Sequence, residues 1–141
     1  MKMLHRAVFA AVIFIAAAAA QTKEGDVIIS VPFEFIVGSQ HLQAGRYVLA
    51  TPLDGIIRIS DSQNPSRPLH IPVHSVQGSG KAATGVVFHC YGQACFLSEV
   101  WTHGSQIGKQ FYESKAEKEI NAERINNKPP RNQVAVLQSA Q

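Results

Sequence analysis

The sequence lacks the short motifs by which many enzymes are recognised. It contains no Gly-x-Ser-x-Gly elbow, no His-Glu-x-x-His helix and no phosphate-binding glycine loop. It also has only two cysteines and one tryptophan in 141 residues. On these grounds we assign no catalytic residue and no cofactor, and we expect a protein that is not an enzyme.

A concentrated patch of positive charge is also missing. The basic side chains of the central region are scattered among acidic ones: Arg46, Arg58, Arg67, Lys81 and Lys109. Nucleic-acid binding usually requires a basic patch or stripe. We therefore expect no nucleic-acid partner, and we interpret the basic segment 124–131 as a solvated linker.

A long hydrophobic run occurs at the N-terminus. Lys2, His5 and Arg6 precede a wholly apolar, alanine-rich stretch over residues 7–20, which is the pattern of a secretory signal peptide. Three alanines end the stretch, so we place cleavage after about residue 20. A membrane anchor is the alternative, but spanning a bilayer takes roughly 20 apolar residues, more than this run provides. We predict export to the periplasm or the extracellular space, with no transmembrane anchor after cleavage.

Cleavage would leave residues 21–141 as the mature chain. Its 121 residues fit a single domain with its own core. Loss of Lys2 and Arg6 with the signal peptide leaves 11 of the 13 basic residues against 10 acidic ones. The sequence pI of about 9.0 therefore overstates how basic the exported chain is.

Most of the mature chain has the pattern of short β-strands separated by turns. Asp54-Gly55 predicts a tight hairpin, and segments 38–45 and 61–68 predict loops. Pro32 and Pro72 restrict their runs to an edge, a start or a break in the ladder. The β-branched and aromatic runs predict strands over residues 27–29, 31–37, 46–50, 56–59 and 69–76. The first two runs are either two short strands or one bent strand.

The strongest local pattern is a hairpin over residues 86–101. A two-residue turn at Gly92-Gln93 would place Cys90 opposite Cys95, with α-carbons about 4.5 to 5.5 Å apart. A disulfide is feasible in that position, and an exported protein favours it over two free thiols. The closed loop is short, so we expect a stabilisation of about 2 kcal/mol or less. A redox-active pair is the less favoured alternative, because such pairs usually have the spacing Cys-x-x-Cys.

Aromatic side chains are the candidates for a ligand-binding surface. Tyr47, Tyr91 and Trp101, together with Tyr112, would form a platform for sugars or peptides if they point outward. Strict alternation along the hairpin places Trp101 on the face of Phe88, opposite Tyr91. Either face can be the buried one, and a core position for Trp101 is the favoured alternative.

The histidines do not predict a metal site. His70 and His74 share a strand face but lie roughly 13 Å apart along a regular strand, too far to bind one ion together. We expect His89 to be a half-buried structural residue, and we expect His41 and His103 to be solvated.

Towards the C-terminus the composition favours a helix. Ser114-Lys115-Ala116-Glu117 fits a capping box, and a helix from about residue 115 to 125 follows. Its apolar face is thin, so it should rest on a sheet. Residues 134–137 are either a last strand or a frayed tail. The predicted fold class is mainly β: a small antiparallel β-sandwich or barrel with one short C-terminal helix.

Four segments carry a resemblance that spans nearly the whole mature chain. They are residues 31–38, 42–48, 88–101 and 114–119, which include VPFEFIVG and SKAEKE. As a set they resemble an uncharacterised family of short exported proteins known mainly from acidobacterial genomes. The resemblance implies export and one β-rich domain, and it supplies no activity or site residue. The two cysteines are not part of its pattern, so the fold should not depend on their disulfide.

These observations favour a non-catalytic binding or envelope-associated module. Its partner would be a carbohydrate, a peptide or an envelope component. The alternative is a small envelope hydrolase or isomerase, which a deep pocket with two or more titratable side chains within hydrogen-bond reach would indicate.

Overall fold

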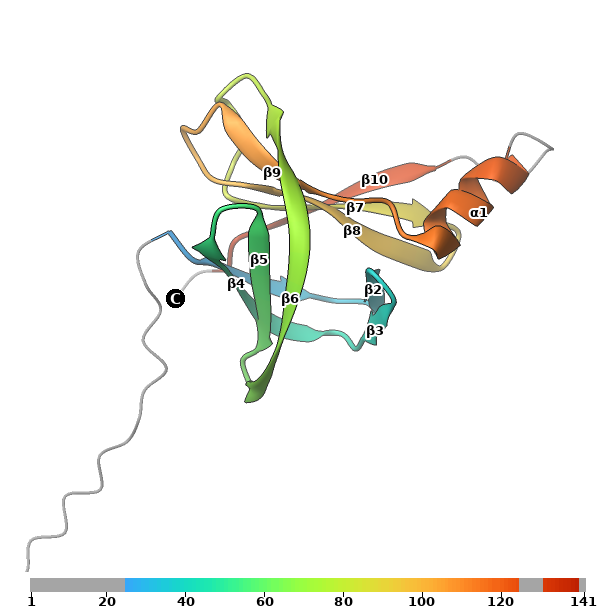
Figure 1. The fold of residues 1–141 in the computed structure, drawn as a ribbon, viewed down its shortest axis with the longest axis horizontal. Coiled ribbons are helices and arrows are strands. Elements are labelled where there is room, and N and C mark those ends of the chain that lie inside the picture. Colours follow the sequence, from blue (N-terminus) through green and yellow to red (C-terminus); the bar gives the residue numbers. More distant parts are fainter. Residues whose placement is uncertain (1–24, 125–130, 140–141) are drawn as a thin grey trace, which may run out of the picture.

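The computed structural model describes residues 25–124 and 131–139 (Figure 1). Within these ranges the chain is mainly β, with one short helix near the C-terminus. The predicted signal peptide, residues 1–20, lies outside the described residues. The elements are β1 (Val27–Val31), β2 (Phe35–Val37), β3 (Gln40–Leu42), β4 (Gly45–Leu53), β5 (Ile56–Asp61), β6 (Asn64–Gln77), β7 (Gly85–Tyr91), β8 (Ala94–Trp101), β9 (Ile107–Phe111), α1 (Lys115–Arg124) and β10 (Asn132–Leu137).

Two mostly antiparallel sheets share the long strand β6. The first sheet has the order β1-β4-β5-β6, and the second continues from β6 through β9, β8 and β7 to β10. β6 belongs to both because it pairs with β5 as far as Pro72 and with β9 from Val73 onward. The β2–β3 hairpin joins β8 through one parallel bridge, between Ile36 and Phe96. The result is a small β-sandwich-like fold with a C-terminal helix, as predicted.

Alternate residues of the two sheets meet in one core. Three aromatic rings pack edge to face at its centre, with the centroid of Phe35 5.2 Å from that of Tyr47 and 5.3 Å from that of Phe88. Burial of such rings and of the β-branched side chains around them is the main favourable term in folding. The core also contains Val27, Ile29, Val31, Val37, Leu49, Ile57, Ile59, Val73, Val86, Leu97, Val100 and Phe111.

The first predicted strands occur, with one addition. The run that Pro32 interrupts forms two strands, β1 and β2, because the ladder stops at Val31 and a new strand starts at Phe35. The predicted loop 38–45 contains the short strand β3, which pairs with β2 across a turn at Gly38. Gly38 has a φ of 59°, a left-handed conformation that glycine adopts without strain.

The prediction that residues 61–68 form a loop is wrong. The hairpin turn is confined to Ser62 and Gln63, and β6 begins at Asn64, which pairs with Asp61. The next pair is Leu69 with Ile59, so the proline-containing segment between the two pairs is irregular and lies outside the regular register. A proline has no N–H to donate to a ladder. An extended chain that skips ladder bonds therefore accommodates both Pro65 and Pro68.

The hairpin over β7 and β8 has the predicted register. Cys90 lies opposite Cys95 and Tyr91 opposite Ala94, on either side of a turn in which Gly92 has a φ of 63°. The two Sγ atoms are 2.12 Å apart, at the distance of a disulfide, and the α-carbons are 4.0 Å apart. The predicted pairing of the cysteines is therefore confirmed.

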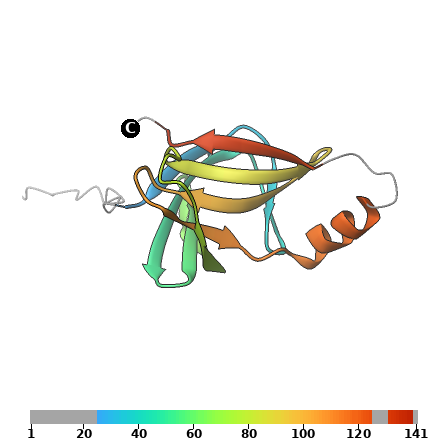
Figure 2. The same ribbon diagram turned by 90° about the horizontal axis from the view of Figure 1, so that it is seen from above.

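The helix α1 begins at the predicted residue. The Glu117 N–H donates to Oγ of Ser114 at 3.1 Å, which is one half of the predicted capping box. The carboxylate of Glu117 is directed elsewhere, to the side chain of Tyr91. Figure 2 shows α1 at one end of the molecule, beyond the ends of β7 and β8.

The last strand completes the arrangement. Residues 134–137 belong to β10, which pairs with β7, so the strand is confirmed in preference to a frayed tail. After it, Gln138 bridges to Ile29, and the Ser139 N–H donates to the Ile28 carbonyl at 2.8 Å. In the part of the chain that the structure describes, no helix is long and apolar enough to cross a membrane.

Candidate functional site

The aromatic candidates do not form one open platform. Tyr47 lies in the core at 4% exposure, and its hydroxyl donates to the Gln43 carbonyl at 2.6 Å. Tyr91 is buried at 7% exposure, with its hydroxyl 2.8 Å from the carboxylate of Glu117. Tyr112 is 60% exposed, but its ring contacts that of His74 at a tilt of 48°. The expectation that Tyr47 and Tyr91 face a ligand is wrong, because packing in the core and under α1 occupies them.

The predicted face of Trp101 is also wrong. Strict alternation would put this residue beside Phe88, but β8 contains a bulge: Phe88 pairs with Leu97, whereas Val87 pairs with Glu99. A bulge inserts one extra residue and reverses the alternation beyond it. Val100 therefore takes the core position, and Trp101 lies on the outer face, half-buried.

The ring of Trp101 lies against two glycines, Gly78 just after β6 and Gly108 within β9. A Cβ added to Gly78 or Gly108 would lie 2.6 Å or 2.8 Å from the ring, so only glycine allows the ring to lie flat there. The indole N–H donates to Oε2 of Glu99 at 2.8 Å. These contacts make Trp101 a packing residue on the outer face, so the favoured expectation of a core position for Trp101 is wrong.

A buried chain of polar side chains connects the hairpin to α1. Oγ of Ser98 lies 3.3 Å from Nε2 of His89, and Nδ1 of His89 lies 3.5 Å from Oε2 of Glu117. The Tyr91 hydroxyl donates to the same oxygen of Glu117. All four side chains are buried, at 5% to 8% exposure. The extra residue of the bulge is Ser98, which lies between the Phe88–Leu97 and Val87–Glu99 pairs, and its hydroxyl reaches the ring of His89.

The surroundings of the buried polar side chains change the pKa of the Tyr91 phenol. Burial raises the pKa of Tyr91 above the ordinary value of 10.0, and its hydrogen bond to the Glu117 carboxylate raises it further. The order of Ser98, His89 and Glu117 is the order of groups in a serine hydrolase triad. The sequence predicted a half-buried structural residue at His89, and the structure buries it further, at 8% exposure.

The other histidines are distributed over separate surfaces. His74 is half-buried, with Nε2 2.9 Å from Oε1 of Gln110, and its ring lies 4.7 Å from that of Tyr112. His41 and His103 are exposed, as predicted. Among residues 25–124 and 131–139, no three His, Cys, Asp or Glu side chains are placed to hold a metal ion.

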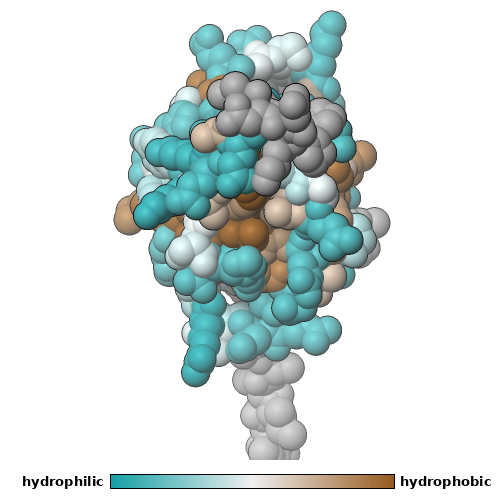
Figure 3. Space-filling model, turned by 90° about the vertical axis from the view of Figure 1, so that its right-hand side faces the viewer, coloured by the Kyte–Doolittle hydropathy of each residue, from teal (hydrophilic) through white to brown (hydrophobic). Residues whose placement is uncertain are grey.

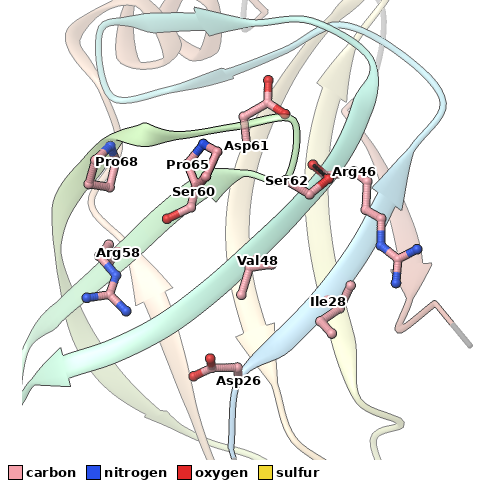
Figure 4. Close-up of a pocket in the computed structure, with 10 residues that line it drawn as sticks. All are labelled: Asp26, Ile28, Arg46, Val48, Arg58, Ser60, Asp61, Ser62, Pro65 and Pro68. Carbon is pink, nitrogen blue, oxygen red and sulfur yellow. Dashed lines mark hydrogen bonds between the residues drawn. The ribbon is translucent and has the colours of Figure 1, made fainter. Parts of the chain in front are cut away.

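A groove lined by charged and polar side chains lies on the outer face of the first sheet (Figure 4). It has a volume of about 400 Å³. Ile28 and Val48, which are paired across β1 and β4, form its floor. Its other lining residues are Asp26, Arg46, Arg58, Ser60, Asp61, Ser62, Pro65 and Pro68.

The two carboxylates of this groove have interaction partners, whereas its two guanidinium groups form no ion pair with a described residue. Asp61 accepts the Gln63 N–H at Oδ1, at 2.9 Å, and Asp26 also has an interaction of its own. Neither guanidinium, that of Arg46 or that of Arg58, forms an ion pair with a residue that the structure describes. Figure 4 shows the two guanidinium groups on opposite sides of the Ile28 and Val48 floor. Within the described ranges, the groove therefore presents two guanidinium groups without an ion-pair partner.

A second hollow lies at the end of the molecule that carries α1. Figure 3 shows an apolar patch at the centre of this end, with hydrophilic side chains around it. The hollow has a volume of about 680 Å³ and lies between the β2–β3 hairpin, the start of β8 and α1. Ile36, Phe96 and Ile120 are among its apolar lining residues, and His41 and Lys115 are among its polar ones.

The alternation of side chains along β4 and β5 is the feature of the sequence that could have indicated the groove. On β4 and β5 the core residues Tyr47, Leu49, Ile57 and Ile59 alternate with Arg46, Val48, Arg58 and Ser60. Period-two alternation puts the second set on one outer face. What the sequence could not give is the order of the strands, which brings β1 and β6 to the two sides of this face.

Comparison with family models, with curated proteins and with solved structures finds no match to this chain.

Proposed function

We propose that this protein is an exported, non-catalytic binding module, and that its outer-face groove holds a ligand that carries negative charge. The observation that supports the proposal most is the pair of guanidinium groups in the groove without an ion-pair partner among the described residues. Hydrogen bonds from arginine to a carboxylate, sulfate or phosphate are among the strongest in proteins. A groove of about 400 Å³ is also within the usual range of small-ligand sites.

Export is the second part of the proposal. The signal-peptide pattern of residues 1–20 and the resemblance to a family of exported proteins both favour it. The Cys90–Cys95 disulfide is compatible with it, because disulfides persist mainly in oxidising compartments. Mass spectrometry of the protein from the exported fraction should find a mature N-terminus near Gln21. Retention of Met1 in that fraction would contradict cleavage.

Calorimetric titration tests the binding proposal. The probes are inorganic phosphate, citrate and a soluble acidic polysaccharide, each at low ionic strength because salt screens exposed charges. We expect at least one probe to bind the native protein and to bind the Arg46→Gln/Arg58→Gln double variant about tenfold or more weakly.

A matched control separates the groove from net charge. The Arg67→Gln/Lys81→Gln double variant also loses two positive charges, but from residues that do not line the groove. It should bind like the native protein. Equal weakening in both double variants would show attraction to overall charge only and would contradict a groove site.

A hydrolase is the second candidate function, and the Ser98–His89–Glu117 chain is the observation that favours it. In such an enzyme Ser98 would attack an ester carbonyl, His89 would accept its proton, and Glu117 would orient the imidazole. The burial of Ser98 at 6% exposure argues against it.

A fluorophosphonate probe distinguishes the two candidates, because it reacts covalently with activated serines. The binding module should remain unlabelled at neutral pH. Labelling of the native protein that is lost in Ser98→Ala, and kept in the exposed control Ser75→Ala, would establish the hydrolase instead.

A further inference from the structure

We infer that the ligand of the outer-face groove is an extended acidic glycan, in which charged sugars are separated by neutral ones. This inference rests on the proposed function and specifies the ligand class of the same groove. Three features of the groove support it: the separation of the two arginines, the chemistry of the floor between them, and the position of the groove on the face of a sheet.

The two arginines are too far apart to share one anionic group. Arg58 on β5 lies opposite Ala50 on β4, which is four residues from Arg46 along the strand. At about 3.3 Å per residue, this places the two residues roughly 13 Å apart along the strand direction. Figure 4 shows their guanidinium groups directed to opposite sides of the floor. A ligand that contacts both must be elongated and must carry two separated acidic groups.

The region between the arginines suits a neutral, hydroxylated segment. Ile28 and Val48 supply aliphatic surface, and the Ser60 hydroxyl lies beside Val48 because the two residues are paired across β4 and β5. Aliphatic surface can contact the C–H faces of sugar rings, and a hydroxyl can both donate and accept a hydrogen bond. A densely charged chain such as polyphosphate would instead place negative charge beside the carboxylates of Asp26 and Asp61, which would repel it.

The position of the groove disfavours a peptide. Peptides that bind to sheets usually do so at an edge, where free backbone groups form new ladder bonds. The groove lies over β4, whose backbone already pairs with β1 on one side and β5 on the other. A peptide would therefore depend on side-chain contacts alone, whereas a glycan needs only the side chains that the groove presents.

The experiment is a titration with hyaluronate oligomers, in which a uronate alternates with a neutral sugar. The probes are free glucuronate and oligomers of increasing length, compared with poly-L-glutamate and polyphosphate. We expect the longer oligomers to bind about tenfold or more tightly than free glucuronate, because only they can reach both arginines. Arg46→Gln and Arg58→Gln should each weaken the long oligomers about tenfold and leave little difference between long and short ones.

Each alternative outcome has a separate meaning. If free glucuronate binds as tightly as the longest oligomer, and binding still needs the arginines, the extended-chain inference is overturned while the proposed function stands. If poly-L-glutamate or polyphosphate binds as tightly as the oligomers, the assignment to a glycan is overturned. If no acidic probe binds, or if Arg67→Gln weakens binding as much as the groove variants do, the proposed function falls with the inference.

Discussion

At the scale of single residues, two buried tyrosines make the stability of this protein dependent on alkaline pH. Burial raises the pKa of Tyr47 above the ordinary 10.0, and the nearby carboxylate of Asp61 raises it further. Burial and the Glu117 carboxylate do the same for Tyr91. A phenol that is held neutral in the folded state ionises more readily once the chain unfolds.

Because both pKa values are higher in the folded state than in the unfolded state, the two tyrosines stabilise the fold less as the pH rises. Below the unfolded-state pKa of 10.0 the contribution of each tyrosine is fully present, and it is lost as pH rises towards the higher folded-state pKa. The free energy of unfolding, measured in urea, should therefore fall as the pH is raised through 10.0. Tyr47→Phe and Tyr91→Phe should each reduce that fall.

An exposed tyrosine provides the control for this prediction. Tyr112 is 60% exposed, so Tyr112→Phe should leave the alkaline dependence as it is in the native protein. If all three variants have the same pH dependence as the native protein, the burial of the two phenols does not govern alkaline stability and the prediction fails.

At the scale of elements, α1 is fixed by a carboxylate and not by an apolar stripe. Ala116 is exposed and Ile120 is half-buried, whereas Glu117 is buried, at 5% exposure. Glu117→Ala would leave the Tyr91 hydroxyl without this acceptor and His89 without this carboxylate. An unsatisfied buried polar group costs about 1 to 3 kcal/mol, which should appear as a lower free energy of unfolding in urea.

Glu119→Ala is the matched variant, because it removes an exposed glutamate from the same helix. It should change the free energy of unfolding by less than about 0.5 kcal/mol. Equal losses in the two variants would mean that the helix depends on its overall charge and not on the contact of Glu117 with the hairpin.

The β7–β8 hairpin should fold without its disulfide. The loop that Cys90 and Cys95 close spans five positions, so its constraint on the unfolded chain is small. We expect Cys90→Ala/Cys95→Ala to lose about 2 kcal/mol or less in urea unfolding and to keep the circular dichroism of the native protein. A double variant that fails to fold would show that the cross-link is required for the fold.

The same hairpin shows how far sequence reasoning reaches. Its turn could be predicted because Gly92 satisfies a local backbone requirement, and the pairing of the cysteines followed from that turn. The bulge at Ser98 could not be predicted, because it depends on packing against other strands. It reversed the face of Trp101 and created the contact with His89.

At the scale of the whole molecule, the long strand β6 determines which surfaces remain open. Because β6 continues from the first sheet into the second, the outer face of the first sheet is separate from the end that carries α1 (Figures 1 and 2). The prediction that residues 61–68 form a loop concealed this continuity. It also concealed one side of the groove, which Pro65 and Pro68 of β6 line.

The central claim is that ligand binds over β1, β4 and β5 on the outer face of the first sheet. Amide chemical-shift mapping by NMR, during titration with a hyaluronate oligomer, tests this claim most directly. We predict that the perturbed amides are concentrated around Arg46, Val48, Arg58 and Ser60, with the β7–β8 hairpin and α1 unchanged. Perturbations centred on the hollow beside α1, or none at saturating oligomer, would contradict it.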